Sequence, residues 1–272
     1  MFLLTSRPSL VLCAWIAIVP LVAGKEPVVP RGVAIQPFNG RDLSGFTKWL
    51  NATEHEDPDS TFSVRDGVIH VSGKGMGYIA TKEAYKDYHL SVEYKWGKRT
   101  DGSKYVRNSG VLLHAVGKDG ARGGVWMTSI ECQLAQGCEG DLIVIRGSNE
   151  DGAEVPATIT SDTRLAADRW HREGTPTKYS GKQFWWSNHQ VGFEELLDTR
   201  GQNDVASPLG EWTRVECICD GDRITIRING VTVNECYDVY PAAGKILLQN
   251  EANEVYFRNL ELRPLKRNAK PG

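Results

Sequence analysis

The residues best suited to chemistry in this chain are Glu131 and Gln133, within the segment Ser129-Ile-Glu-Cys-Gln-Leu134. If this segment is a β-strand, both polar side chains lie on one face, about 7 Å apart at a rise of ~3.3 Å per residue. A carboxylate can exchange a proton, whereas an amide can only hold a hydroxyl or carbonyl group in place. The pair favours a surface that binds or cleaves sugars, although a half-buried strand with a solvated polar face gives the same pattern.

The elements that must position these residues are predicted to be β-strands. Tyr88 to Trp96 alternates between apolar and polar residues, and Gly110 to Val116 repeats the pattern, with His114 expected on the outward face. Asp66-Gly67 and Asn229-Gly230 lie between alternating runs, which is a strong signal for hairpins. With many strands and few amphipathic helical patterns, the sequence predicts an all-β, antiparallel two-sheet jelly-roll sandwich.

Composition and charge exclude several classes of protein. The chain has 32 basic and 34 acidic residues, a net charge of −2 and no basic stripe, so a nucleic-acid partner is not expected. Residues 1–24 end in Val22-Ala-Gly24 and are typical of a cleaved signal peptide, which predicts export to the periplasm or cell exterior. Beyond them, no apolar run is long enough to span a membrane.

Five cysteines follow the predicted cleavage site, and their spacing fits no disulfide scaffold. Cys217 and Cys219 share a face of a predicted strand, so small core residues are the better interpretation. No histidine pattern accompanies the cysteines. The sequence therefore indicates no metal ligands and no cofactor, but it leaves open a bound divalent metal.

The domain boundaries follow from composition. We expect a signal peptide at 1–24, a proline-bearing linker at 25–36, one jelly-roll domain at 37–264 and a basic tail at 265–272. Residues 147–210 have few strand signals and form an irregular excursion. Loops of this length in compact domains are usually functional or disordered, and the aromatic residues here favour an ordered one.

A succession of short motifs across residues 37–264 resembles the 3-keto-disaccharide hydrolase domain family. They are Pro37-Phe-Asn-Gly-Arg-Asp-Leu-Ser-Gly-Phe46, Asp66-Gly67, Tyr88 to Trp96, Asn108-Ser-Gly-Val-Leu-Leu-His114, Ser129-Ile-Glu-Cys-Gln133 with Gly140-Asp141, Gly210-Glu-Trp212, Ile228-Asn-Gly230, Gly244-Lys-Ile-Leu-Leu-Gln249 and Val255-Tyr-Phe-Arg-Asn259. Each motif alone is weak, but their number and order make the resemblance strong. It implies a concanavalin-A-like jelly roll that hydrolyses glycosides whose ring hydroxyl at C3 is oxidised to a ketone.

Such a substrate explains a site without the paired carboxylates of a glycosidase. A C3 ketone acidifies the hydrogen at C2, so a base can form an enolate, the C1 substituent leaves, and water adds to the resulting glycal. The route needs a base, a donor for the enolate oxygen and an acid near the leaving group.

Three residues are candidates for the catalytic groups. Glu131 is the first choice for the base. His114 could be the acid or the enolate donor, because imidazole titrates near neutral pH, but a strand histidine can equally be a structural hydrogen-bonding group. Asp141 is the third candidate, and its alternative is a turn cap.

Residue type and predicted face indicate six substrate-binding candidates: Gln133, Asn108, Glu93, Lys95, Trp126 and Arg258. Gln133 would orient a hydroxyl, Trp126 would stack on a sugar ring, and Arg258 would hold a ketone oxygen. Ion pairs between strands are the alternative for Glu93, Lys95 and Arg258, and core packing is the alternative for Trp126. For the whole protein, the alternatives are a non-catalytic sugar-binding module and a structural jelly roll.

Overall fold

The computed structural model describes residues 25–99, 101–164, 169–179, 181, 183–186 and 188–266. The predicted signal peptide, residues 1–24, lies outside the described residues, as do residues 267–272 of the predicted tail. The described residues form strands, turns and loops, and none of them is helical. Consequently no described segment is a helix long and apolar enough to cross a membrane.

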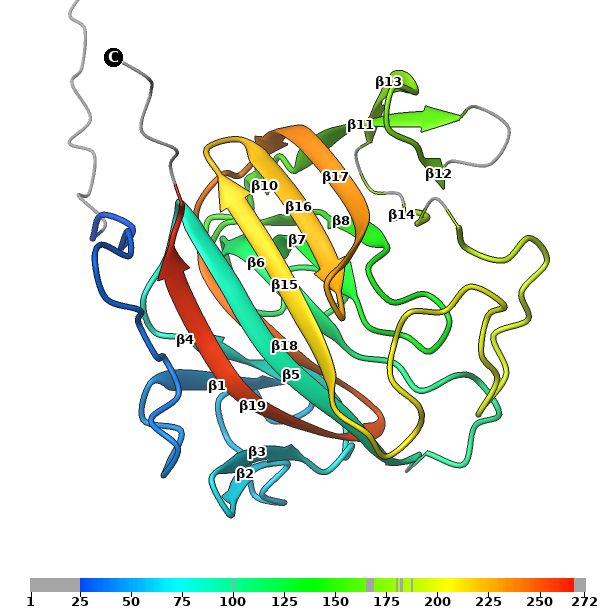
Figure 1. The fold of residues 1–272 in the computed structure, drawn as a ribbon. Coiled ribbons are helices and arrows are strands. Elements are labelled where there is room, and N and C mark those ends of the chain that lie inside the picture. The colour runs from blue at the N-terminus through cyan, green and yellow to red at the C-terminus, as the bar shows by residue number, and fades with distance from the viewer. Residues whose placement is uncertain are drawn as a thin grey trace, which may run out of the picture.

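Two antiparallel sheets face each other and form the predicted jelly-roll sandwich (Figure 1). The seven-stranded sheet has the spatial order β1 (Phe46–Leu50), β4 (Met76–Thr81), β18 (Lys245–Glu251), β6 (Gly110–Val116), β7 (Thr128–Gln133), β8 (Leu142–Ile145) and β14 (Gln183–Phe184). The ten-stranded sheet has the order β12 (Arg169–Trp170), β11 (Thr158–Arg164), β17 (Val231–Tyr240), β16 (Arg223–Ile228), β15 (Thr213–Asp220), β5 (Tyr88–Arg99), β19 (Asn253–Pro264), β3 (Val68–Val71) and β2 (Phe62–Arg65), and β13 (Thr175–Tyr179) pairs with β11. A separate hairpin pairs β9 (Gly147–Ser148) with β10 (Glu154–Val155).

Two of the tight turns adopt the backbone that their residues predict. Asn229 and Gly230 have φ values of 48° and 84° and join β16 to β17, with Ile228 paired to Val231. Asp66 and Gly67, at 50° and 74°, join β2 to β3 in the same way. Positive φ at both central residues matches the right-handed twist of the strands, and asparagine, aspartate and glycine tolerate it best.

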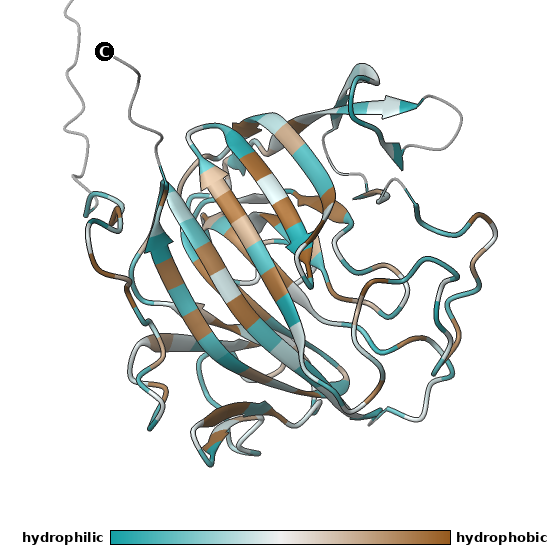
Figure 2. Cartoon of the chain, in the orientation of Figure 1, coloured by the Kyte–Doolittle hydropathy of each residue, from teal (hydrophilic) through white to brown (hydrophobic). Residues whose placement is uncertain are grey.

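The main core lies between the sheets, where alternate residues of each strand meet. Figure 2 shows the alternation as stripes of hydrophobic and hydrophilic residues along the ten-stranded sheet. Leu90, Val92 and Tyr94 of β5 are buried in this core, together with Ile130 and Cys132 of β7. The opposite residues of β7 must therefore lie on the face of the seven-stranded sheet that is turned away from the core.

The five cysteines of the described chain are all free and buried. Cys217 and Cys219 pack in the main core, as their strand spacing predicts. The fold is thus held by apolar packing and sheet hydrogen bonds, without a disulfide among the described residues.

Two segments that seemed irregular in the sequence contact the sandwich. In the expected linker, Val28 bridges to Tyr85 and Ile35 bridges to Leu262. The excursion at 147–210 contains the short strands β9 to β14, and β14 extends the seven-stranded sheet at β8. In Figure 1 the part of this excursion after β14 runs as a long loop at the side of the sandwich before β15 begins.

Candidate active site

A cavity of about 780 Å³ lies on the face of the seven-stranded sheet that is turned away from the main core. Its lining includes Glu131 and Gln133 of β7 and Gln249 and Glu251 at the end of β18. Loop residues form its walls, among them Trp126. The period-two prediction for β7 is therefore confirmed, because Ile130 and Cys132 face the core while Glu131 and Gln133 face the cavity.

Glu131 is 4% exposed, and its carboxyl group leans over the neighbouring strand β6. The strand residue beneath it is Gly110, and a Cβ atom built there would fall 2.3 Å from Glu131 Oε1. Burial raises the pKa of Glu131 well above its usual value, and the charge of Glu251 raises it further. A hydrogen bond from the Gln249 side chain offsets part of this rise.

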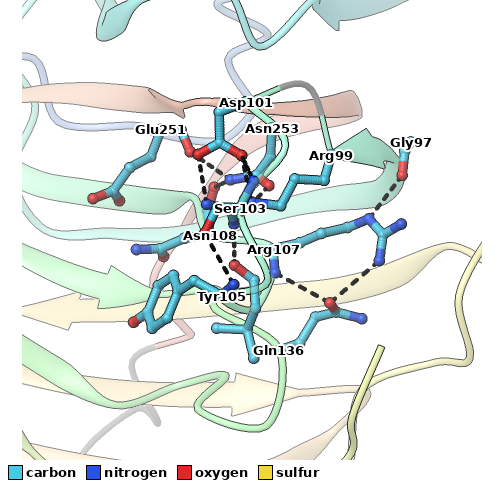
Figure 3. Close-up of polar contacts among 11 residues, drawn as sticks. Gly97, Arg99, Asp101, Ser103, Tyr105, Arg107, Asn108, Gln136, Glu251 and Asn253 are labelled. Carbon is cyan, nitrogen blue, oxygen red and sulfur yellow. Dashed lines mark hydrogen bonds and ion pairs between the residues drawn. The ribbon is translucent and has the colours of Figure 1, made fainter. Parts of the chain in front are cut away.

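Glu251 is a second carboxyl group in the same cavity, and the sequence did not single it out. It is the last residue of β18 and pairs with Met76 of β4. Burial raises its pKa to about 7, while the positive charge of Arg99 acts in the opposite direction. Figure 3 shows Glu251 together with Arg99 and two further cavity residues, Tyr105 and Asn108. The side chain of Arg99 is itself held by Asp101, Asn253 and the Val106 carbonyl group.

Several buried polar atoms of the cavity lining have no hydrogen-bond partner among the described residues. They are Asn108 Oδ1, Glu131 Oε1 and Gln249 Oε1. Buried polar atoms in proteins are almost always hydrogen-bonded, so their concentration in one cavity is typical of a site for a hydroxylated ligand. The side-chain oxygen of Gln133 accepts hydrogen bonds from the backbone N–H groups of Leu134 and Ala135. Its amide nitrogen is therefore the polar group that it can offer to a ligand, as a donor.

One side of the cavity carries an aromatic and aliphatic surface. Trp126 is half-buried and packs beside Tyr78, with ring centroids 6.4 Å apart. Both belong to a second apolar cluster on the outer face of the seven-stranded sheet, with Leu112, Met127 and Leu247. A flat aromatic surface next to carboxyl and amide groups is a combination that suits a sugar ring.

His114 does not contribute to this cavity, and the prediction that it points outward is wrong. The pairing of β6 with β7 is irregular between Leu113 and Val116, and His114 has a φ of 54°. This bulge reverses the alternation, so the ring is fully buried against the core residue Tyr88, at a centroid distance of 5.8 Å. Burial lowers the pKa of His114 to about 4, although its hydrogen bond to the Pro241 carbonyl opposes this.

Asp141 is also absent from the cavity lining. It is fully buried and accepts hydrogen bonds from the Trp186 backbone N–H at 2.6 Å and from the Gln183 side chain at 3.1 Å. Burial raises its pKa to about 8 despite these hydrogen bonds. Asp141 thus ties the excursion to the start of β8, and of its two partners only Gln183 reaches the cavity.

Three of the substrate-binding candidates lie on the ten-stranded sheet instead. Arg258 Nε is 2.7 Å from Glu93 Oε2, and its guanidinium group lies 4.0 Å from the centre of the Trp212 ring. Lys95 lies over the same ring, at 5.0 Å. The alternative of ion pairing is therefore confirmed for Glu93 and Arg258, which face away from the core on strands β5 and β19.

A comparison with protein families identifies the family of this chain. Residues 33–263 match the family of 3-keto-alpha-glucoside-1,2-lyase-like domains. The chain belongs to this family. It is the family that the sequence motifs indicated, and its name describes lyase chemistry on a glucoside with a ketone at C3. No curated protein matches the chain.

Solved structures share the fold. A crystal structure of a candidate glycosyl hydrolase from Parabacteroides distasonis has a TM-score of 0.50 and 18% identity, and the match covers 86% of this chain and 94% of that one. The carbohydrate-binding module CBM66 from Bacillus subtilis has a TM-score of 0.45 and 10% identity, over 79% of this chain and 93% of that one. LamAcat from Zobellia galactanivorans has a TM-score of 0.45 and 11% identity, over 86% of this chain and 97% of that one.

Proposed function

We propose that this protein is an exported enzyme that cleaves 3-keto-glycosides by proton abstraction at C2, elimination of the C1 substituent and hydration. The observation that carries the proposal is the pair of carboxyl groups, Glu131 and Glu251, in one polar cavity with raised pKa values. Carboxyl groups with raised pKa values in a cleft are typical of acid–base sites. Family membership supplies the class of substrate.

The proposed reaction needs one base and one acid. The base removes the hydrogen from C2, which the neighbouring C3 ketone acidifies, and an enolate forms. The electrons of the enolate then expel the C1 oxygen substituent, which leaves as an alcohol after it receives a proton from the acid. Water adds across the C1–C2 double bond of the resulting keto-glycal, and the product is a free 3-keto sugar.

The two carboxyl groups differ in a way that assigns these roles. Two interacting carboxyl groups in a buried site share one proton at neutral pH, because two adjacent negative charges are unfavourable there. Glu131 is the more deeply buried, and the charge of Glu251 adds to the rise of its pKa, so it holds the proton. Because the pKa of Glu251 is about 7, more than half of its carboxyl groups are ionised at slightly alkaline pH. We therefore assign Glu251 as the base and Glu131 as the acid. The sequence alone had suggested Glu131 as the base.

The remaining groups of the cavity can hold the sugar. The amide nitrogen of Gln133 can donate to the ketone oxygen, where negative charge develops in the enolate. Asn108 Oδ1 and Gln249 Oε1 can accept from ring hydroxyl groups. Trp126 offers an apolar face for stacking.

The direct test is incubation of the purified protein with 3-keto-trehalose and 3-keto-lactose, followed by measurement of released 3-ketoglucose. Unoxidised trehalose and lactose are the controls, because without the ketone the C2 hydrogen is not acidic. We expect release only from the oxidised sugars. Binding without release would favour a non-catalytic sugar-binding module, and cleavage of the unoxidised sugars would favour an ordinary two-carboxylate glycosidase.

Export is the second part of the proposal. Its support is the apolar segment that ends at Gly24, outside the described residues. The expected mature N-terminus is close to Lys25. N-terminal sequencing of the protein recovered from the periplasm or medium tests this, and a retained Met1 on that material would contradict it.

A further inference from the structure

A second cluster of chemically active side chains lies beside the cavity but outside it. Cys138, Asp141 and His189 offer one sulfur, one carboxylate oxygen and one imidazole nitrogen, and these three atoms lie within 4.8 Å of one another. All three residues are at most 9% exposed. The half-buried Glu195 lies next to Cys138, with its Oε1 atom 3.5 Å from Cys138 Sγ.

The hydrogen positions in this cluster are set by its neighbours. His189 Nδ1 lies 3.0 Å from the Gln190 carbonyl oxygen, which can only accept, so Nδ1 carries the hydrogen. The other nitrogen, Nε2, then presents a lone pair to Cys138 Sγ at 3.4 Å. A histidine fixed by a backbone carbonyl group at one nitrogen, with the other free, is the usual arrangement for a metal ligand.

Cys138 faces two acceptors, His189 Nε2 at 3.4 Å and Glu195 Oε1 at 3.5 Å. Glu195 also accepts a hydrogen bond from the Tyr105 hydroxyl group, so the thiol hydrogen is available to His189. A divalent cation in place of that hydrogen would give the Cys138 sulfur, the His189 nitrogen and the Asp141 oxygen a common partner.

The distance between Cys138 and His189 fits two ligands of a tetrahedral zinc ion. With Zn–S near 2.3 Å and Zn–N near 2.0–2.1 Å, the edge from sulfur to nitrogen is about 3.6 Å. The observed distance from Cys138 Sγ to His189 Nε2 is 3.4 Å, and the Asp141 oxygen lies within 4.8 Å of both atoms. Asp141 has accepted one hydrogen bond at each oxygen, so each oxygen keeps a lone pair for the metal.

The charges also balance. A thiolate and one carboxylate carry two negative charges, which a divalent cation would neutralise. Arg169 donates to the backbone carbonyl of His189 and acts electrostatically on Asp141. The combination of sulfur and imidazole ligands favours zinc over calcium or magnesium.

We propose that Cys138, Asp141 and His189 bind a zinc ion that ties the excursion to the sheet. Three protein ligands leave the fourth tetrahedral position to a water molecule. Cys138 and Asp141 belong to the connection between β7 and β8, whereas His189 belongs to the excursion that follows β14. The ion fixes this excursion to the sheet that carries Glu131, and it holds the part of the cavity wall formed by Gln183 through Asp141.

The test measures metal binding on the untagged mature protein and needs no sugar, so its outcome is independent of the proposed enzymatic activity. The protein is first freed of metal with a chelator and then titrated with zinc chloride against a chromophoric competitor. We expect one zinc ion per chain, and no binding of calcium or magnesium to this site. With cobalt in place of zinc, we expect a thiolate-to-cobalt charge-transfer band.

Matched variants identify the ligands. Cys138→Ala and His189→Gln should lower the zinc affinity more than about 100-fold, because loss of a direct ligand exceeds the 10–100-fold effect of losing its hydrogen-bonded support. Cys236→Ala and His171→Gln remove a buried cysteine and a histidine elsewhere in the chain and should bind zinc as the parent does. If Cys138→Ala fails to fold, the cobalt spectrum of the parent decides. A parent without the thiolate band, or a folded Cys138→Ala that binds zinc as tightly as the parent, overturns the proposal.

Discussion

The carboxyl group of Glu131 occupies the space that a side chain at Gly110 would need. The two residues lie diagonally across β6 and β7, and a Cβ atom at Gly110 would fall 2.3 Å from Glu131 Oε1 and 3.0 Å from its Cγ and Cδ atoms. Every atom of the Glu131 side chain near Gly110 would have to move. Gly110 is therefore a positioning residue for the acid–base pair.

Gly110→Ala should lower kcat on a 3-keto-glycoside by about 100-fold or more, because a displacement of about 1 Å in a catalytic group can have that effect. Gly201→Ala is the matched control, since the nearest atom to a Cβ there is 3.9 Å away and its backbone is not in the left-handed region. Kinetics and thermal melts of both variants check the prediction. A folded Gly110→Ala enzyme with the parent's kcat would show that the position of Glu131 does not matter for turnover.

Glu131→Gln and Glu251→Gln should each lower kcat by about 10²–10⁴-fold on 3-keto-trehalose, which is the usual contribution of a general acid or base. They should differ on a 3-keto-glucoside with a nitrophenolate leaving group, because such a group leaves without a proton. We expect Glu131→Gln to recover most of its rate on that substrate and Glu251→Gln to remain slow. The reverse pattern would return the base to Glu131 and the acid to Glu251.

The pH dependence follows from the pKa of Glu251, which burial raises to about 7. The base must be ionised to accept a proton, so kcat/KM should rise as the pH increases through about 7. The acid, Glu131, must keep its proton, and burial raises its pKa well above its usual value, so any decrease in rate belongs at more alkaline pH. A pH profile on a 3-keto-glycoside tests this, and a rate that is flat between pH 5 and 8 would contradict a base with this pKa.

The sequence predicted the features that depend on local pattern. Period-two alternation placed Glu131 and Gln133 on the correct face of β7, and the Asn229-Gly230 turn has the predicted two-residue form. His114 was misplaced because a bulge in the pairing with β7 reverses the alternation, and alternation in β6 alone does not reveal a bulge.

Glu251 was overlooked because it follows Gln249 and Asn250 in a segment that resembles a turn between two strands. Strand β18 in fact continues to Glu251, since it pairs with β4 through that residue. Which polar residues meet in the cavity depends on the pairing of strands far apart in the chain, with β6 lying between β18 and β7. The proposed zinc ligands were missed for the same reason, because His189 and Cys138 are distant in sequence.

The outer face of the ten-stranded sheet should be unimportant for catalysis. Arg258 pairs with Glu93 and stacks on Trp212. The strands of Arg258 and Glu93 belong to the ten-stranded sheet, whereas Glu131 and Glu251 belong to the seven-stranded sheet. Arg258→Met should leave kcat and KM within about threefold of the parent. The expected loss in the free energy of unfolding is about 1 kcal/mol. An exposed ion pair contributes less than about 1 kcal/mol, and an exposed cation–π contact contributes about 0.5–1 kcal/mol. A large rise in KM would place a sugar contact on this face after all.

A further buried carboxyl pair, Glu139 and Asp204, lies outside the cavity lining. Burial raises the pKa of Glu139 well above its usual value, and the charge of Asp204 contributes. Burial also raises the pKa of Asp204, while a hydrogen bond from Glu139 acts against the rise. The raised pKa of Glu139 favours its protonated form, which donates a hydrogen bond to Asp204; Asp204 also pairs with Arg200 at 3.4 Å.

This pair should make the protein less stable as the pH rises. A carboxyl group whose pKa is higher in the folded than in the unfolded state binds its proton more tightly in the folded state. The stabilisation that this proton gives is complete below the pKa of the unfolded state, about 4.5 for Glu139. It is lost as the pH rises toward the pKa of the folded state. Glu139→Gln keeps a donor to Asp204 but cannot ionise, so we expect its Tm to fall less than that of the parent between pH 5 and 8. Glu211→Gln, at an exposed position, is the control and should follow the parent. Thermal melts across this pH range decide the question, because equal pH dependence in parent and Glu139→Gln would mean that Glu139 is ionised in the folded protein.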